Sequence, residues 1–287
     1  MAAGEGKGWA KGRTAKGDPR IARAAAAHRG KQYVPRLPAE RDRRRKSAPA
    51  GMNWTDDLAY AVGLIATDGC VADGDHVSFV SADLELVEHL LRCLGKRNMA
   101  SAFRTRTGGT AFRTQIGDVA FCRWLATIGI APRKSLLLGA IDAPDELFVP
   151  LVRGLLDGDG SIMNKRTLAD TGRRPDYFWE YLQTRFVSAS QSHIVWLESR
   201  IRTNLGIGGY VAIGRGPHGR RPQYTLRFGK RSSLRLLPIL YADPTAPWLT
   251  RKWRVWADYV ARHCQANEIG NIGPQQAQVA KLADAHV

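Results

Sequence analysis

The chain has 287 residues, 44% of them hydrophobic, enough for one large domain or two small ones with a true core. Its formal net charge of +17 indicates a polyanionic partner, with nucleic acid ahead of an anionic membrane and acidic protein last. No apolar run of about 18 residues occurs, and no apolar leader opens the chain, so we expect neither a membrane span nor a secretory signal.

Residues 1–50 form a strongly basic segment. They contain fourteen Lys or Arg against four acids, so they carry +10 of the +17 charge. Glycine and alanine separate many of the charges. This composition predicts a largely disordered arm, which is either a solvated extension or a segment that lies along phosphates or in a minor groove.

A short apolar segment, 61–69 (AVGLIATDG), predicts a helix with a glycine in its middle and an Asp-Gly end. The carboxylate of Asp68 would lie at the negative end of the helix dipole, which costs about 0.3–1 kcal/mol. Downstream, the apolar periodicity predicts a strand ending at 79–82 (FVSA), a helix over 84–94 capped by Asp83, a strand at 112–117, a helix over 119–128, and then the basic pair Arg133 and Lys134.

The same order recurs in the second half of the chain. Segment 152–160 (VRGLLDGDG) again ends an apolar, glycine-containing helix in Asp-Gly, at Asp159. It is followed by FVSA at 186–189, a helix over 194–205 capped by Ser190 or Ser192, a strand at 224–229, a helix over 234–241, and the pair Arg251 and Lys252. The longer internal spacing reflects an insertion at 165–179. Because the disfavoured helix end appears twice, we expect a cation between the two ends.

Both segments resemble the LAGLIDADG motif of homing endonucleases, specifically the single-chain kind with two motif copies. The resemblance covers roughly residues 54–264. It implies an α+β fold in which two αββαββα halves form a pseudo-two-fold repeat. Two antiparallel sheets would form a DNA-binding saddle, with the motif helices packed at its centre through Gly63 and Gly154. The expected divisions are an arm at 1–50, a first half at 51–140, a second half at 141–266 and a tail at 267–287.

The same resemblance assigns roles to residues at the centre. Asp68 and Asp159 would bind divalent metal, with two or three Mg²⁺ ions shared between these aspartates and the scissile phosphates, since Mg²⁺ prefers carboxylate oxygen. Such ions would activate water and stabilise the leaving oxygen. Lys134 and Lys252 would neutralise charge near the scissile phosphate. Asp157 has no counterpart in the first copy, so it is expected to face solvent or the partner half.

Two positions leave one role of this family without a candidate. Ala82 and Ala189 align where related enzymes often carry a polar residue that organises water. His193 could fill that role in part, but a lone histidine on a helix is more often a satisfied surface side chain.

The strands alternate arginine, glutamine and threonine, which places such side chains on one face of a sheet. Arginine can pair with guanine and glutamine with adenine in the major groove. The residues expected to contact double-stranded DNA are Arg104, Arg106, Arg113, Gln115, Gln183, Arg185, Arg221, Gln223 and Arg227.

The resulting hypothesis is a monomeric, pseudo-dimeric homing endonuclease that makes a staggered double-strand break in a long asymmetric target. The alternatives are an RNA maturase that binds intron RNA and a non-cleaving regulator. Retention of Asp68 and Asp159 favours the enzyme. An intein is disfavoured because the chain neither starts with Cys or Ser nor ends in His-Asn. Scattered cysteines and 32 Arg against 11 Lys favour a cytoplasmic protein of a GC-rich bacterium or phage.

Overall fold

The computed structural model of the chain describes residues 52–72, 76–168, 178–215 and 222–265, together with Pro19. Contacts divide the chain into two units, Met1–Ser47 and Ala48–Val287. All the helices and strands discussed below belong to the second unit. Apart from Pro19, the basic arm predicted at 1–50 lies outside the described residues, as do the tail at 267–287, Arg221 and most of the insertion.

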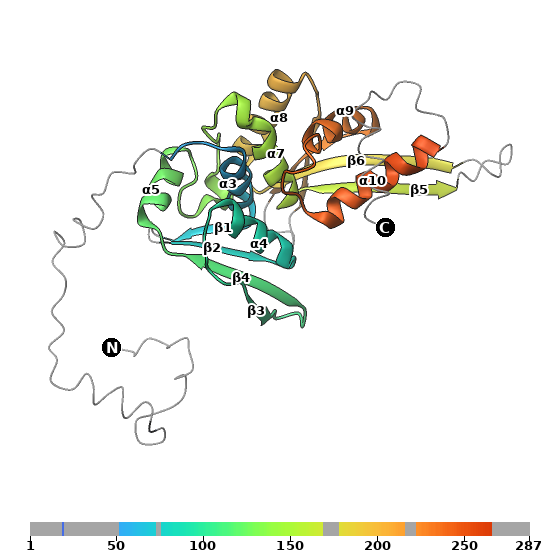
Figure 1. Ribbon diagram of the computed structural model, residues 1–287. Helices are drawn as coiled ribbons and strands as arrows, with labels where there is room; N and C mark the ends of the chain where they lie inside the picture. The colour runs from blue at the N-terminus through green and yellow to red at the C-terminus, as the bar shows by residue number, and fades with distance from the viewer. Residues whose placement is uncertain (1–18, 20–51, 73–75, 169–177, 216–221, 266–287) are drawn as a thin grey trace. The chain divides into compact units, whose positions relative to one another are not determined.

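The second unit contains two copies of one sequence of elements (Figure 1). The first copy comprises α3 (Asp56–Asp68), β1 (Gly69–Ala72), β2 (His76–Ser81), α4 (Leu84–Cys93), β3 (Ser101–Arg104), β4 (Thr110–Ile116), α5 (Val119–Thr127) and α6 (Lys134–Leu137). The second comprises α7 (Phe148–Asp157), β5 (Ser161–Leu168), β6 (Phe178–Ser188), α8 (Gln191–Leu205), β7 (Tyr210–Arg215), β8 (Pro222–Phe228), α9 (Lys230–Leu240) and α10 (Thr250–Gln265). A 3₁₀ turn, η1 (Asp145–Leu147), leads into α7.

Each copy forms its own four-stranded antiparallel sheet, and the two sheets have the same strand order. The orders are β1-β2-β4-β3 and β5-β6-β8-β7. In both, the helix-facing side carries buried aromatic residues, such as Phe79 in the first sheet and Phe186 in the second. The α+β fold and the pseudo-two-fold repeat of αββαββα halves predicted from the sequence are therefore confirmed.

The motif helices α3 and α7 pack side by side at the centre (Figure 1). Thr55 starts α3 by accepting a hydrogen bond from Leu58 N at 3.1 Å, and two acids in the first turn favour the positive helix end. Nine of the 13 residues of α3 and nine of the 10 residues of α7 are buried, so their apolar runs serve the core of the unit. A Cβ at Gly63 would lie 2.4 Å from Leu151 O, and one at Gly154 would lie 2.2 Å from Tyr60 O. Only glycine permits this backbone approach.

The remaining helices differ from prediction in detail. Ser190 caps α8 as expected, whereas Asp83 occupies the N-cap position of α4 without a side-chain capping bond. The four-residue helix α6 and η1 are too short for a periodic signal. The aromatic residues of α10 pack inward, since Trp253, Trp256 and Tyr259 are buried. None of the helices in the described part of the chain combines the length and apolar character needed to cross a bilayer.

Candidate functional site

Asp68 and Asp159 meet where the two motif helices end. Asp68 is the last residue of α3, and Asp159 is the second residue after α7. Burial first, and then the charge of Asp159, raise the pKa of the Asp68 carboxyl to about 6 against the opposing charges of Lys252 and Lys134. Asp159 is more accessible, and partial desolvation also raises its pKa against the opposing effect of Lys134 and Lys252. The repeat thus places two carboxylates within electrostatic reach of each other.

Lys134 and Lys252 lie at the ends of these same helices. Both are almost fully buried, at 6% and 4% exposure. Lys134 Nζ donates hydrogen bonds to Ala66 O at 2.6 Å and Thr67 O at 2.9 Å, at the end of α3. Lys252 Nζ donates to the carbonyls of Leu156, Asp157 and Gly158, at 2.7, 2.7 and 2.8 Å, at the end of α7.

These lysines account for the disfavoured carboxylates at the helix ends. An ammonium group satisfies carbonyls that have no intrahelical partner and opposes the negative end of the dipole. Burial lowers the pKa of both lysines, that of Lys252 to about 8, while the aspartates raise it. The expected cation between the helix ends is therefore supplied, at least in part, by the protein's own side chains. The sequence pattern indicated the basic pairs but not the carbonyls that they contact.

A cavity of about 230 Å³ opens beside Asp159. Lys134 lines it from the first half, and Ser188, Ala189 and Gln223 line it from the second sheet. Ala189 is thus placed at the site, as the alignment of the repeats suggested, but it contributes no polar group. The cavity extends from Asp159 and Lys134 to Val187 and Gln223 of the second sheet.

Asp157 lies apart from this cavity and is completely buried. Its Oδ2 accepts hydrogen bonds from Tyr60 OH at 2.9 Å and from Leu249 N at 2.8 Å. Burial raises its pKa to about 6, opposed by Lys252. Asp157 was expected to face either solvent or the partner half. It does not face solvent, and it contacts the partner half through Tyr60. Asp157 connects α7 to α3 and to the segment before α10.

His193 does not face the carboxylates as a water-organising group. It is buried in α8, stacks on Trp196, and its Nδ1 lies 2.9 Å from Gly139 O. Burial lowers its pKa to about 4. The expectation of a surface histidine was therefore wrong, because His193 is buried. The expectation that its side chain has a hydrogen-bond partner is confirmed.

This buried histidine should make folding sensitive to acid. Because its folded pKa lies below its unfolded value, protonation favours the unfolded chain, and stability falls as the pH drops from about 6.5 towards 4. We expect a loss of about 2–3 kcal/mol over that range, measured by urea unfolding. His193→Asn, which keeps a donor for Gly139 O but cannot titrate, should flatten this pH dependence. An unchanged slope in the variant would contradict the assignment.

Polar side chains cover the sheet faces opposite the helices. In the first sheet, Arg113 and Gln115 share the open face, and the Arg113 guanidinium lies 5.5 Å from the ring centroid of Phe103. In the second sheet the strand register places Gln183, Arg185, Gln223 and Arg227 together on the corresponding face.

One pair on this face is electrostatically unfavourable. Arg185 lies directly across from Arg227, and like charges at such positions repel. Gln183 accepts a hydrogen bond from Arg185, and Arg227 Nε is buried without a hydrogen-bond partner. A bound anion or a guanine edge would relieve both features.

Two predicted strand contacts are placed differently. Arg104 pairs with Thr110, so its side chain lies on the helix-side face, opposite to that of Arg113, and it donates to Gly108 O at 3.0 Å. Arg106 lies in the turn between β3 and β4. The prediction extended the two-residue alternation of side chains past Arg104, the last residue of β3. Beyond the end of a strand this alternation no longer holds.

The carboxylate pair fits Mg²⁺ in its donor chemistry. Within the described residues no group of three or more His, Cys, Asp or Glu side chains forms a site by itself. Mg²⁺ is commonly held by one or two carboxylates together with water and substrate phosphates, and Asp68 and Asp159 supply that protein share. Burial is the main cause of their raised pKa values, and a divalent cation would favour the ionised form of both carboxyls.

Solved structures resemble the chain only at low sequence identity. No protein-family model matches the chain, and no curated protein matches it. The solved structures that resemble it are LAGLIDADG proteins. The meganuclease I-SmaMI, bound to uncleavable DNA, is 11% identical, with a TM-score of 0.47 over 82% of this chain and 97% of that one. The homing endonuclease I-WcaI, bound to its recognition sequence, is 10% identical, with a TM-score of 0.44 over 75% of this chain and 90% of that one. The N-terminal LAGLIDADG domain of DUF199/WhiA is 12% identical, with a TM-score of 0.43 over 73% of this chain and 95% of that one.

Proposed function

We propose that the chain is a site-specific DNA endonuclease that cuts both strands of a long asymmetric target in a divalent-metal-dependent hydrolysis. The observation that carries the proposal is the pairing of Asp68 with Asp159 beside two buried lysines. Two partly buried acids whose pKa values are raised, that of Asp68 also by the charge of Asp159, are costly to keep in the folded chain, and cation-assisted phosphodiester hydrolysis gives that arrangement a use.

Each part of the site has a distinct role in this proposal. Asp68 and Asp159 would hold Mg²⁺, which when bound would supply Lewis-acid activation of water and of the scissile phosphates. Lys134 and Lys252 hold the helix ends in place and add positive potential near the phosphates. The open faces of the two sheets contact double-stranded DNA, with Arg113 and Gln115 on one half and Arg185, Gln223 and Arg227 on the other. Gln183, expected from the sequence as a contact, is only 2% exposed and instead holds Arg185. The protein acts as a monomer because both halves are in one chain.

The reconstructed insertion site provides a direct test. Joining the two DNA segments that flank the gene should regenerate the target, and the purified full chain with Mg²⁺ should make a staggered double-strand break in it. EDTA should abolish cutting of the target. A duplex of scrambled sequence, the control, should stay uncut with Mg²⁺ present. Binding of structured intron RNA without any cleavage of the joined DNA would instead favour a maturase, and binding of DNA without cleavage would favour a regulator.

A further inference from the structure

The two lysines of the site differ in how many of their hydrogen-bond donors are used. An ammonium group has three N–H donors. Lys252 gives all three to backbone carbonyls of the α7 end. Lys134 donates to two carbonyls of the α3 end, and it lines the cavity beside Asp159. Lys134 therefore keeps one N–H for a ligand, whereas Lys252 has none without breaking a helix-end bond.

The arginines that precede these lysines also differ in their polar partners: the one before Lys252 is paired, and the one before Lys134 is not. Arg251 forms a two-pronged ion pair with Asp83, from Nε at 3.0 Å and Nη2 at 2.9 Å. Its counterpart Arg133 is exposed, with no hydrogen bond or ion pair to any described residue. Arg133 is also the one non-glycine residue with positive φ, 61°, in the described part of the chain. A left-handed arginine is uncommon, and such positions gather at functional sites.

The residues that the repeat aligns at the starts of α4 and α8 differ between the two halves. The repeat aligns Asp83 with Ser190 and Glu85 with Ser192. In the first half, Asp83 binds Arg251, and Glu85 accepts from Thr250 N at 3.1 Å. In the second half, Ser190 Oγ and Ser192 Oγ lie 2.9 Å apart, and each lies within hydrogen-bond distance of Leu138 O.

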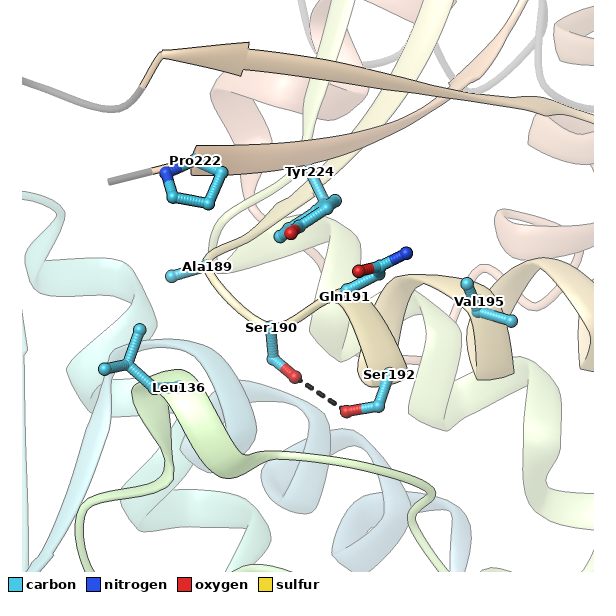
Figure 2. A pocket seen from close by; sticks show the side chains of 8 residues that line it. All are labelled: Leu136, Ala189, Ser190, Gln191, Ser192, Val195, Pro222 and Tyr224. Atoms are coloured by element: carbon cyan, nitrogen blue, oxygen red, sulfur yellow. Dashed lines mark hydrogen bonds between the residues drawn. The ribbon is translucent and has the colours of Figure 1, made fainter. Parts of the chain in front are cut away.

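The groove beside these serines remains open (Figure 2). Leu136 of α6, Gln191 and Ser192 of α8 and Pro222 of β8 lie around it, and none of its eight lining residues is acidic. The corresponding position in the first half carries two carboxylates that are already paired with the start of α10. One side of the centre thus has an unused N–H on Lys134, an exposed Arg133 and a groove without acids, although Asp159 shares the cavity that Lys134 lines. On the other side, Arg251 is neutralised by Asp83.

We infer that the two scissile phosphates are treated unequally: the phosphate on the Arg133–Lys134 side is bound directly and its strand is cut first, so that a nicked duplex accumulates before the double-strand break. This inference rests on the proposed function and adds an order to it. Arg133 acts as a phosphate-binding residue on the first strand. Asp83 acts as a positioning residue that withholds Arg251 from the second strand and adds negative charge near Asp68.

Strand-resolved kinetics on the joined target test this order. Each strand is labelled at its 5′ end, and the full chain is added with Mg²⁺ under single-turnover conditions. We expect the wild type to cut one strand about tenfold faster than the other, less than the roughly 10²-fold that a fully preorganised donor contributes. Arg133→Gln should slow the fast strand only. Asp83→Asn, which removes the charge that holds Arg251, should speed the slow strand only. Arg254→Gln, at another exposed arginine of α10, should change neither.

The possible outcomes distinguish a failure of the inferred order of strand cleavage from a failure of the proposed endonuclease activity. Equal rates for both strands in the wild type would overturn the inference while leaving the endonuclease in place, as would an equal effect of Arg133→Gln on both strands. If Asp83→Asn proves unstable by thermal melting, Ser190→Asp provides the converse test. It puts an acid at the position that the repeat aligns with Asp83, and that acid should slow the fast strand. Absence of cleavage on either strand by the wild type would remove the proposed function and the inference with it.

Discussion

Replacing Asp68 or Asp159 by asparagine should abolish cleavage of the joined target, by about 10³-fold or more for either strand. Each aspartate supplies one of the two carboxylates at the centre, and an amide of the same shape carries no charge to hold a divalent cation. A group that acts on developing charge in a water-poor site contributes at least about 10²–10³-fold, and here metal binding and charge stabilisation are lost together. The measurement is single-turnover cleavage with Mg²⁺, beside a gel-shift assay for DNA binding.

The asparagine variants should nevertheless fold, and Asp68→Asn should be more stable than the wild type in EDTA. The pKa of Asp68 is raised to about 6, so its ionised form is disfavoured in the folded state. At pH 7.5 the neutral amide removes that penalty, which we place at about 1–3 kcal/mol for a partly buried group. The gain should shrink as the pH falls below 6 and the wild-type carboxyl becomes protonated. Cleavage that persists at the wild-type rate in both folded variants would refute the proposed centre.

Internal repetition made most of the fold predictable. One apolar helix with a glycine and an Asp-Gly end is ambiguous, but a second copy followed by the same FVSA phrase and the same basic pair fixes the order of elements in both halves. Helix periodicity and glycine stops then placed α4, α5 and α8 within a few residues of their observed bounds. The elements missed, α6 and η1, are shorter than one period of the pattern that reveals helices.

The site was predictable only in part, because its contacts join residues far apart in sequence. The pattern indicated Lys134 and Lys252 as basic residues, yet their carbonyl partners lie 68 and 96 positions away. Asp157 illustrates the same limit: an unmatched acid looked peripheral, whereas it is buried against Tyr60, 97 positions away. Alternation within a strand predicted Arg113 and Gln115 on one face, but it could not locate the end of β3 and so misplaced Arg104 and Arg106.

The glycines of the motif helices should show the largest effect on folding. Gly63→Ala or Gly154→Ala should lower the free energy of unfolding by about 3 kcal/mol or more, at or above the upper end of typical overpacking costs. The new Cβ would lie 2.4 Å from Leu151 O in the first case and 2.2 Å from Tyr60 O in the second. Both are backbone atoms of the partner helix, so the clash can be relieved only by moving α3 away from α7. Urea unfolding of each variant gives the measurement.

Intrinsic helix propensity predicts the opposite sign, which makes this test discriminating. In an isolated helix, alanine in place of glycine stabilises by about 0.5–1 kcal/mol. Gly117→Ala is the matched control, because a Cβ there would meet no atom within 4 Å, and its stability should change by less than about 0.5 kcal/mol. Separation of the helices would also pull Asp68 from Asp159, so the motif variants should lose cleavage even where they remain folded. Stabilisation by either motif substitution would mean that α3 and α7 do not approach each other through these glycines.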